Sequence, residues 1–459
     1  MSAVARLLAA HRAGGEPLRV LSASGQLGFG IPEAAFKTGI ARRPHFIGCD
    51  MGSVDPGPYY LGSGRIAASP PIARRDLEMV LLAARALDVP LTIGSAGTAG
   101  AAPHLQATLA IVRDIARQHG LNFRLATIES DIPADTVIGA VRAGRLAPLA
   151  HMPAVTEQEI RACSHVVGQC GTETFRRAFE LSPDVVIAGR ACDTAVFSAL
   201  PEMLGYAPGE CAHMAKIVEC TSLCCTPGGR DAILALLDVD GFVLESMNPA
   251  RHATPASVAA HALYEQTDPF EVIEPTGRVL LDSARYSALD AHRTRVSGAR
   301  WLPATQPSIK IEGALRLGER AVLLAGSVAP TFIAALPQIL RDVEATARAI
   351  LPSSWQVFPH GYGLGAIRAL PAGAPPPAEV GLVIEFIAEA AELALAAAAV
   401  FRQHLLHHGF PGRVSTAGNI AFAFTPPEFN CGTAYRFALY HVMQVDDIAA
   451  HFRVEAVQV

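Results

Sequence analysis

An α/β fold is the prediction from the sequence: a mostly parallel sheet covered by helices, followed by a smaller α+β two-layer sandwich domain. From residue 17 to about 200, short apolar runs, Gly-rich loops and amphipathic helices repeat in order, which is typical of βαβ units. After about residue 230, strands follow one another more directly, which favours antiparallel pairing. A chain of 459 residues exceeds one ordinary core, so we expect an α/β domain at 1–300 and an α+β domain at 301–459.

The first domain contains five expected strand–loop–helix units. Each apolar run is short and bounded, and each helix is long enough to bring the chain back across the sheet. The expected strands are 18–23, 45–48, 89–97, 123–130 and 183–191, and the helices that follow them are 32–43, 73–87, 105–120, 134–144 and 192–204.

The second domain contains two strand–strand–helix phrases, which predict a two-layer sandwich. The expected elements are a hairpin at 308–328 turning at Leu317–Glu319, a helix at 332–351, a strand near Trp355–Phe358, a strand within 379–388 and an Ala-rich helix at 389–408. A Pro-rich loop lies at 371–379. The tail from residue 415 is expected to add a C-terminal hairpin.

Composition argues against several classes of protein. The net charge is −5 and no run is rich in Lys or Arg, so the electrostatic footprint of a nucleic-acid-binding protein is missing. No eighteen-residue segment is uninterruptedly apolar, and the first residues lack a long apolar signal region. We therefore expect a cytoplasmic, soluble protein with a small-molecule ligand and no membrane. With 51% hydrophobic and 17% charged residues, a homo-oligomer is the expected assembly.

The nine cysteines are expected to be reduced thiols. Their number is odd and they are spread over a large chain without a secretory signal, which argues against a disulfide framework. Cys220, Cys224 and Cys225 lack the two-residue spacing of a zinc knuckle, and no matching Cys/His pair follows. We expect them to be small buried hydrophobes that carry no metal.

The loop after the second expected strand is the first candidate site. It follows the apolar residues Phe46–Gly48 and contains Asp50, Asp55, Tyr59 and Tyr60 among Gly and Pro. Loops at the carboxyl ends of parallel strands line the crevice where ligands normally bind. Asp50 and Asp55 are therefore candidate general bases or metal ligands, and Tyr59 is a candidate catalytic donor. The alternative is a long connection shaped by Pro-Gly turns and Asp caps.

The loop at 93–104 is a candidate anion cradle. Its glycines allow backbone N–H groups to converge where a helix begins, and the helix dipole favours an anion there. The spacing matches neither the dinucleotide fingerprint nor the P-loop. Close packing of the helix on the strand is the alternative. The candidate substrate-binding residues are Ser95, Gly97, Thr98 and His104.

Arg190 and Asp193 lie at the junction of the fifth strand and its helix. Arg190 is a candidate for bidentate binding of a substrate carboxylate. The alternative is that Asp193 caps the helix and pairs with Arg190.

A polar stripe occurs at 213–220, where His213 and Lys216 share a helical face and Glu219 is partly aligned with them. We expect this stripe to be solvated.

No cofactor is firmly indicated by a motif. If Asp50 and Asp55 lie close together in the pocket, their hard carboxylates favour Mg²⁺ or Mn²⁺ over zinc. No fingerprint for a nicotinamide, flavin or pyridoxal cofactor was found.

Several long phrases resemble the acyclic terpene utilisation protein AtuA family. They are DMGSVDPGPYYLGSG, IGSAGTAG followed by PHL, DVVIAGRACDTAVFSALP, and NPARHATPASVAAHALYEQTDP with RVSGARW. They occur in the family's order and extend over nearly the whole chain from about residue 18. The resemblance implies catabolism in which branched CoA esters are intermediates. It carries over no catalytic residues.

Two functional hypotheses follow. The first is a catabolic enzyme of hydratase or lyase type, in which acidic loops perform addition–elimination on a branched carboxylic acid or its CoA ester. The second is a non-catalytic binding or scaffold subunit that works with a separately encoded partner, because no Ser-His-Asp or Cys-His signature is present.

Overall fold

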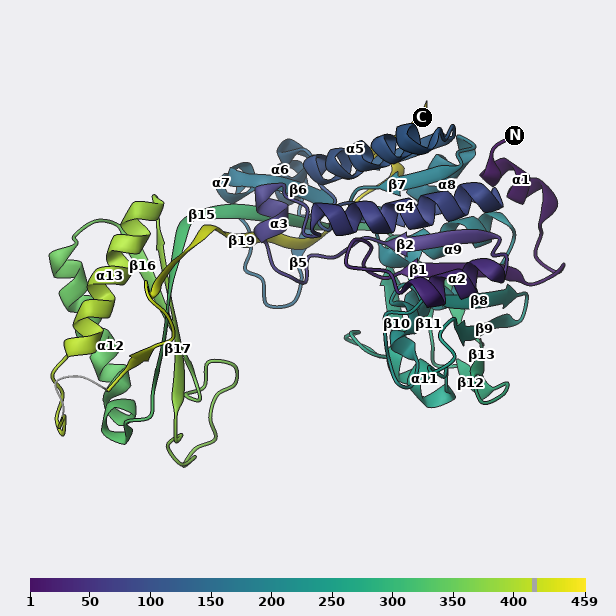
Figure 1. Cartoon of the computed structure of the whole chain (residues 1–459). Coiled ribbons are helices and arrows are strands. Elements are labelled where there is room, and N and C mark those ends of the chain that lie inside the picture. Colours follow the sequence, from purple (N-terminus) through teal and green to yellow (C-terminus); the bar gives the residue numbers. More distant parts are fainter. Residues whose placement is uncertain (415–418) are drawn as a thin grey trace. The chain divides into compact units, whose positions relative to one another are not determined.

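The computed structural model describes residues 1–414 and 419–459 and shows a mixed α/β protein with a parallel central sheet, which confirms the expected fold class (Figure 1). The chain forms two compact units. The first consists of Met1–Leu315 with Phe437–Val459, and the second of Arg316–Arg436. The division expected at residue 300 lies before the first of these boundaries, and the end of the chain groups with the first unit.

The first unit is built on a ten-stranded sheet whose central strands are parallel. In spatial order these strands are β1 (Leu18–Ser24), β2 (Phe46–Asp50), β3 (Leu91–Gly94), β7 (Val185–Ala188) and β4 (Arg124–Glu129). β3, β7 and β4 lie within expected apolar runs, whereas β1 and β2 overlap the expected runs 18–23 and 45–48 and end one and two residues later, at Ser24 and Asp50. Their residues are almost all buried, as expected for a sheet covered on both faces.

Antiparallel strands extend this sheet on both sides. Next to β1 lie β8 (Ile233–Asp238), β9 (Gly241–Ser246), β13 (Arg293–Ser297) and β12 (Arg285–Ala288), and next to β4 lies β20 (Arg453–Gln458). The pairing of β20 with β4 explains why the last residues of the chain belong to the first unit.

Helices cover both faces of the parallel strands. Phe46 and Ile47 are adjacent on β2 and enter different core clusters, since successive side chains of a strand point to opposite faces. On the Ile47 side pack α2 (Glu33–Ala41), α4 (Pro70–Leu87) and α5 (Ala102–His119). On the Phe46 side pack α8 (Thr172–Glu180), α9 (Asp193–Met203) and α10 (Pro208–Val218).

The remaining elements of the first unit are short. They include a three-stranded sheet of β10 (Glu271–Glu274), β11 (Gly277–Leu280) and β14 (Arg300–Pro303). The others are α1 (Ala3–Ala10), α3 (Tyr59–Ser63), α6 (Ala134–Arg142), β5 (Leu146–Pro148), α7 (Glu157–Ala162), β6 (Cys163–Gly168), η1 (Thr221–Cys224), α11 (Pro255–Ala262) and η2 (Ala449–His451).

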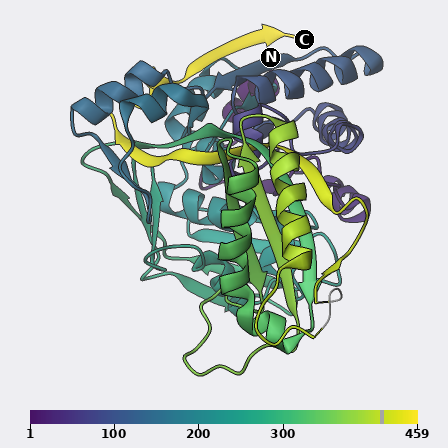
Figure 2. The ribbon, with the colours of Figure 1, turned by 90° about the vertical axis from the view of Figure 1, so that its left-hand side faces the viewer.

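The second unit has helices on a sheet. The later part of β15 (Ser308–Ser327) pairs with β17 (Val380–Ala388), which pairs with β16 (Trp355–Tyr362). Figure 2 shows α12 (Pro330–Ile350) and α13 (Ala391–His407) side by side on one face of these strands. Their apolar faces and the strands share one core, which includes Phe332, Phe386 and Phe401.

The hairpin predicted at Leu317–Glu319 is wrong, because β15 runs through this position as one strand. Its first part pairs with β6 up to Leu315 and its later part pairs with β17 from Glu319. Gly318 adopts φ +149° where the pairing partner changes, so the glycine marks an irregularity in a strand and not a turn.

Two strands of the tail both pair with β15, and the structure pairs neither with the other within the described residues. β18 (Ala421–Phe422) pairs with β15, and β19 (Glu428–Gln444) lies between β15 and β5 in the sheet. The two are therefore not partners in a hairpin within the described residues. The start of the expected hairpin, at 415–418, lies outside them.

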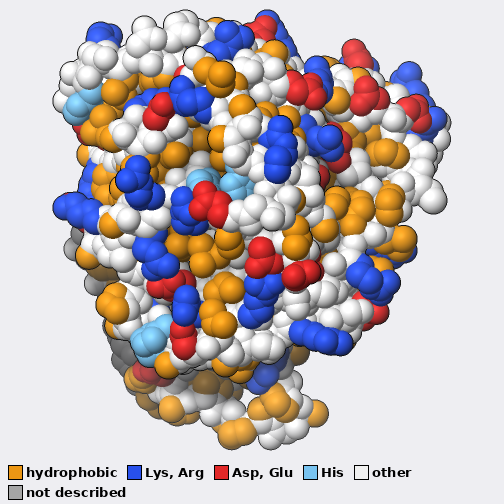
Figure 3. All heavy atoms as spheres, turned by 90° about the vertical axis from the view of Figure 1, so that its right-hand side faces the viewer, with side chains coloured by type: hydrophobic (Ala, Val, Ile, Leu, Met, Phe, Trp, Pro, Cys, Tyr) orange, Lys and Arg blue, Asp and Glu red, His pale blue; other side chains and the backbone are white. Residues whose placement is uncertain are grey.

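The surface, the cysteines and the helix lengths can be compared with the expectations from composition. On the face that Figure 3 shows, basic and acidic side chains are interspersed with apolar ones. All nine cysteines are free thiols in the described part of the chain. None of the helices described combines the length and the apolar character that crossing a bilayer requires.

Candidate functional site

A cleft opens at the carboxyl ends of the parallel strands, formed by loops that follow β1, β2 and β7. One cavity of about 390 Å³ is lined by Gln26, Asp50, Asp193 and Glu219, among others. A second cavity of about 350 Å³ shares lining residues with it, including Asp55, Asp193 and Glu219. We refer to the two connected cavities as the cleft. Its position is the one expected for ligand binding in an open α/β sheet.

The loop after β1 is held in place by Asp76 of α4. The carboxylate of Asp76 accepts hydrogen bonds from the backbone N–H groups of Gly28, Gly30 and Ile31 at 2.8–3.1 Å. Because Asp76 is fully buried, these bonds are shielded from water. They fix the loop that carries Gln26 to the cleft.

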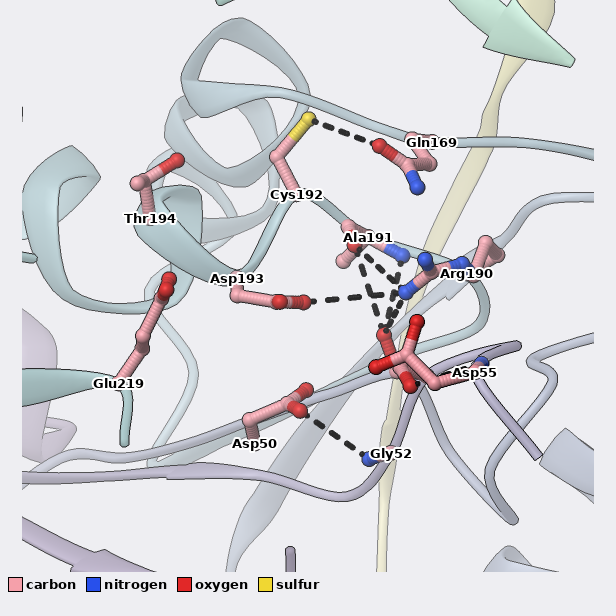
Figure 4. Close-up of polar contacts among 12 residues, drawn as sticks. Asp50, Gly52, Asp55, Gln169, Arg190, Ala191, Cys192, Asp193, Thr194 and Glu219 are labelled. Carbon is pink, nitrogen blue, oxygen red and sulfur yellow. Dashed lines mark hydrogen bonds and ion pairs between the residues drawn. The ribbon is translucent and has the colours of Figure 1, made fainter. Parts of the chain in front are cut away.

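Asp50, the last residue of β2, is the most buried acid that lines the cleft (Figure 4). Its Oδ2 accepts a hydrogen bond from the backbone N–H of Gly52 at 3.2 Å. Its Oδ1 is buried without a hydrogen-bond partner among the described residues. Burial, assisted by the charge of Asp193, raises the pKa of Asp50 well above its usual value.

Asp193 and Glu219 complete a group of three acids, which we call the acid cluster. Asp193 is the first residue of α9, and Glu219 follows the last residue of α10. Burial raises the pKa of Asp193, while Arg190 opposes that rise. Burial also raises the pKa of Glu219 to about 8, despite the ion pair of 2.9 Å with Lys216, and Asp193 adds to the increase.

Asp55 and Tyr59 lie in the same loop as Asp50 but in different surroundings. Asp55 is exposed and lines both cavities of the cleft, and its backbone N–H donates to Ser53 Oγ at 3.1 Å. Tyr59 begins α3, where its ring packs edge-on against that of Tyr60 at 5.4 Å. Tyr59 does not line either cavity of the cleft. The structure thus brings Asp50 and Asp55 to the cleft, whereas Tyr59 is not one of its lining residues.

The loop at 93–104 lies behind the cleft. Ser95, Thr98 and His104 are buried, and neither they nor Gly97 line the two cavities. Ser95 and Thr98 have positive φ angles of 51° and 92°, so the loop turns sharply without glycine at these positions. His104 Nε2 lies 2.9 Å from the carbonyl oxygen of Tyr60. These contacts fit the alternative of close packing better than an open anion cradle.

The guanidinium of Arg190 is enclosed by protein groups. Its Nε donates to Glu312 Oε2 at 2.9 Å, and its Nη1 donates to Ser95 Oγ at 3.0 Å. Asp193 lies farther away, with 3.7 Å between Nη1 and Oδ1. The main partner of Arg190 is therefore Glu312, which neither sequence alternative included.

Glu312 is the buried anchor of this network. It lies on β15, is fully buried, and also pairs with Lys310 at 3.2 Å. Burial alone would raise its pKa, but Arg190 and Lys310 hold the pKa below its usual value. Sequence reasoning missed Glu312 because alternating residues in a strand suggest solvent exposure. The sequence feature that could have indicated it is the pair Lys310 and Glu312, opposite charges on one face of a segment whose other face carries Ile309 and Ile311.

The polar stripe at 213–220 is buried, so the expectation of a solvated stripe is wrong. His213, Lys216 and Glu219 are at most 7% exposed. Helix α10 contacts α9, α11, β8 and β14, and these elements cover the side that the pattern assigned to water. The sequence feature that could have indicated burial is the apolar character of the other residues of this helix, which is typical of a helix buried on all sides.

The candidate metal ligands can be compared with the geometry. A possible metal site needs at least three His, Cys, Asp or Glu side chains with their ligand atoms close together. Among the described residues, His11, Glu16 and His45 form such a group, with ligand atoms that all lie within 4.8 Å of one another. His45 Nε2 lies 2.7 Å from Arg19 Nη2, and this cation would repel a metal ion. Asp50 and Asp55 are not members of this group of three.

The comparisons with known proteins give a family-model match over part of the chain. No curated protein and no solved structure matches the chain. Residues 78–216 match the model of the acyclic terpene utilisation family protein AtuA. This segment contains the buried loop at 93–104, Arg190, Asp193 and Lys216. Over residues 78–216, the match confirms the resemblance to the acyclic terpene utilisation AtuA family that the sequence predicted.

Proposed function

We propose that this protein is an acid–base catalyst of addition–elimination, of hydratase or lyase type, acting on a branched carboxylic acid or its CoA ester. The observation that carries the proposal is the acid cluster, in which Asp50, Asp193 and Glu219 line one cavity with raised pKa values. Raised pKa values at a cleft are characteristic of groups that exchange protons during catalysis.

The electrostatics of the acid cluster supply both an acid and a base near neutral pH. Three neighbouring carboxyl groups resist simultaneous ionisation, because each negative charge raises the pKa of the next. The cluster as a whole therefore holds protons at pH values where isolated carboxyl groups have lost them. A protonated member can donate a proton while an ionised member accepts one.

Hydration shows how this arrangement would serve an α,β-unsaturated substrate. An ionised carboxylate removes a proton from water as the water oxygen attacks the β-carbon. A protonated carboxyl group then delivers a proton to the α-carbon, so that one water molecule is added and no other reactant is consumed. The reverse sequence is dehydration. Asp193 is the proposed proton acceptor, and Asp50 and Glu219 are the proposed proton donors.

Arg190 has a positioning role in this proposal. Its hydrogen bonds to Glu312 and Ser95 hold it behind Asp193. Its positive charge limits the rise in the pKa of Asp193, which favours Asp193 as the ionised member of the cluster.

The substrate class is supported by the family match, because the family takes its name from acyclic terpene utilisation. A bound divalent cation is the alternative to protonation as a way of neutralising the negative charge of the acid cluster. Mg²⁺ and Mn²⁺ are the ions that carboxylates favour. If Mg²⁺ bound tightly and abolished proton uptake by the acid cluster, the result would favour metal-assisted catalysis over acid–base catalysis by the carboxyl groups.

Turnover of a substrate panel tests the proposal. The purified chain is incubated in D₂O with branched 2-enoic acids, 3-hydroxy acids and their CoA esters, and deuterium incorporation at the α-carbon is followed by NMR. We expect incorporation with the wild type, and a loss of about a hundredfold or more in Asp50→Asn and Glu219→Gln. No incorporation with any member of the panel, together with co-purification of a separately encoded subunit, would favour a scaffold subunit instead.

A further inference from the structure

We propose that Arg230 binds the anionic group of the ligand at the 390 Å³ cavity of the cleft, an inference that rests on the proposed function. Arg230 lines this cavity with Asp50 and Glu219. Its side chain is exposed, and its Nη2 donates to Gln26 Oε1 at 3.1 Å. Its guanidinium carbon lies 6.0 Å from the centre of the Phe29 ring.

The contacts of Arg230 leave its charge uncompensated. The amide of Gln26 and the ring of Phe29 are both neutral, and they orient the guanidinium without neutralising it. The acid next to Arg230 in sequence, Asp231, forms an ion pair with Arg251 instead. Most of the donors of Arg230 therefore remain for a ligand, and a guanidinium suits bidentate binding of carboxylate or phosphate.

The other cations that line the cleft are neutralised by buried glutamates. Among the described residues, Arg230 is the one cation of the cleft for which the structure gives no carboxylate partner. The paired cations are Arg190 and Lys310, which share Glu312, and Lys216, which pairs with Glu219. An incoming anion at Arg190 would compete with Glu312, whereas at Arg230 it would displace no carboxylate that is already paired with the arginine among the described residues.

The acids that line this cavity with Arg230 are Asp50, Asp55, Asp193, Glu219 and Glu265. Asp50 and Glu219 have raised pKa values, so they carry less negative charge at neutral pH than their number suggests. The formal excess of acids in this cavity therefore overstates its repulsion of a carboxylate.

An apolar wall next to Arg230 indicates the shape of the ligand. Leu223 and Tyr264 line the same cavity and are 48% and 37% exposed. A ligand with an anionic group on Arg230 and an apolar body on these two side chains would reach toward Asp50. A branched acid provides the anion as its carboxylate, and a CoA ester provides it as a phosphate, so the two sources share one recognition chemistry.

Calorimetric binding with matched probes tests this inference. The probes are 3-methylbut-2-enoate, its primary amide, which has the same shape without the charge, and coenzyme A. We expect the wild type to bind the acid or coenzyme A at least about tenfold more tightly than the amide, and Arg230→Gln to lose that preference. The control is Arg113→Gln, which changes an exposed arginine of α5 outside the cleft and should bind like the wild type.

The pattern of results identifies the source of the anion. Binding of the acid that depends on Arg230 assigns the site to a substrate carboxylate, and binding of coenzyme A that depends on Arg230 assigns it to a CoA phosphate. Equal affinity of Arg230→Gln and wild type for these anions would overturn the inference, as would a failure of both anions to bind to the wild type.

The inference and the proposed function can fail separately. Binding that depends on Arg230, without turnover of any substrate, would refute the enzymatic proposal and leave the anion site standing. Turnover with a KM that Arg230→Gln does not change would refute the anion site and leave the enzymatic proposal standing.

Discussion

Replacing Glu312 with Gln should destabilise the first unit strongly while changing the shape of one side chain very little. Glu312 is fully buried and compensates two cations, Arg190 through Nε at 2.9 Å and Nη2 at 3.4 Å, and Lys310 at 3.2 Å. Glutamine keeps one acceptor oxygen but removes the charge. Of its two ion-pair partners among the described residues, Arg190 would then keep only Asp193, at 3.7 Å.

The expected cost follows from the penalty for a buried charge without its partner. Removing one partner of a buried ion pair typically costs about 3–5 kcal/mol, which corresponds to a fall in the melting temperature of at least about 5 °C. Chemical unfolding at pH 7, followed by circular dichroism, measures the difference between Glu312→Gln and the wild type.

Glu157→Gln is the matched control for this measurement. Glu157 accepts two hydrogen bonds from Arg142, as Glu312 does from Arg190, but both partners are largely exposed. Exposed pairs contribute little, so this variant should unfold like the wild type. Equal stability of Glu312→Gln and Glu157→Gln would refute the argument that Glu312 is a buried anchor.

Three further predictions test separate parts of the account. Glu219 has a pKa raised from 4.5 to about 8 in the folded protein, so the free energy of unfolding should fall as pH rises between these values. Glu219→Gln should flatten this pH dependence, and melting scans with an unchanged slope would contradict the prediction. Arg190→Lys should lower the melting temperature with little change in ligand affinity, because its partners are Glu312 and Ser95; a tenfold loss of affinity in a stable variant would restore the carboxylate-clamp hypothesis. Gly100→Ala should reduce folded yield, because a Cβ there would lie 2.1 Å from the backbone nitrogen of Arg190; normal yield and melting would show that the loop can shift.

The parallel core of the fold was predictable because its signal is local. Apolar runs of four to seven residues specify β1, β2, β3, β4 and β7 from short stretches of sequence. The course of β15 was not predictable in this way. Gly318 and its charged neighbours resemble a turn, and only the change of pairing partner from β6 to β17 shows that the strand continues.

The candidate site was predictable in part. Asp50 and Asp193 follow strands of the parallel sheet, so their meeting at one edge follows from topology. Glu219 and Glu312 could not be assigned in the same way, since their burial depends on elements distant in sequence. Glu312 meets Arg190 across 122 residues, and Glu219 is buried beside Lys216 on a helix whose covering strands come later in the chain.

The central claim is that the acid cluster of Asp50, Asp193 and Glu219 holds protons near neutral pH. Infrared difference spectroscopy of the wild type against Asp50→Asn and Glu219→Gln measures this directly, because the C=O stretch of a protonated carboxyl group is separated from that of a carboxylate. The account predicts a protonated carboxyl band at pH 7 that weakens in each variant, and the part of the band that Glu219→Gln removes should fade as pH rises through about 8, the pKa of Glu219. A wild-type spectrum at pH 7 without any protonated carboxyl band that these variants alter would contradict it.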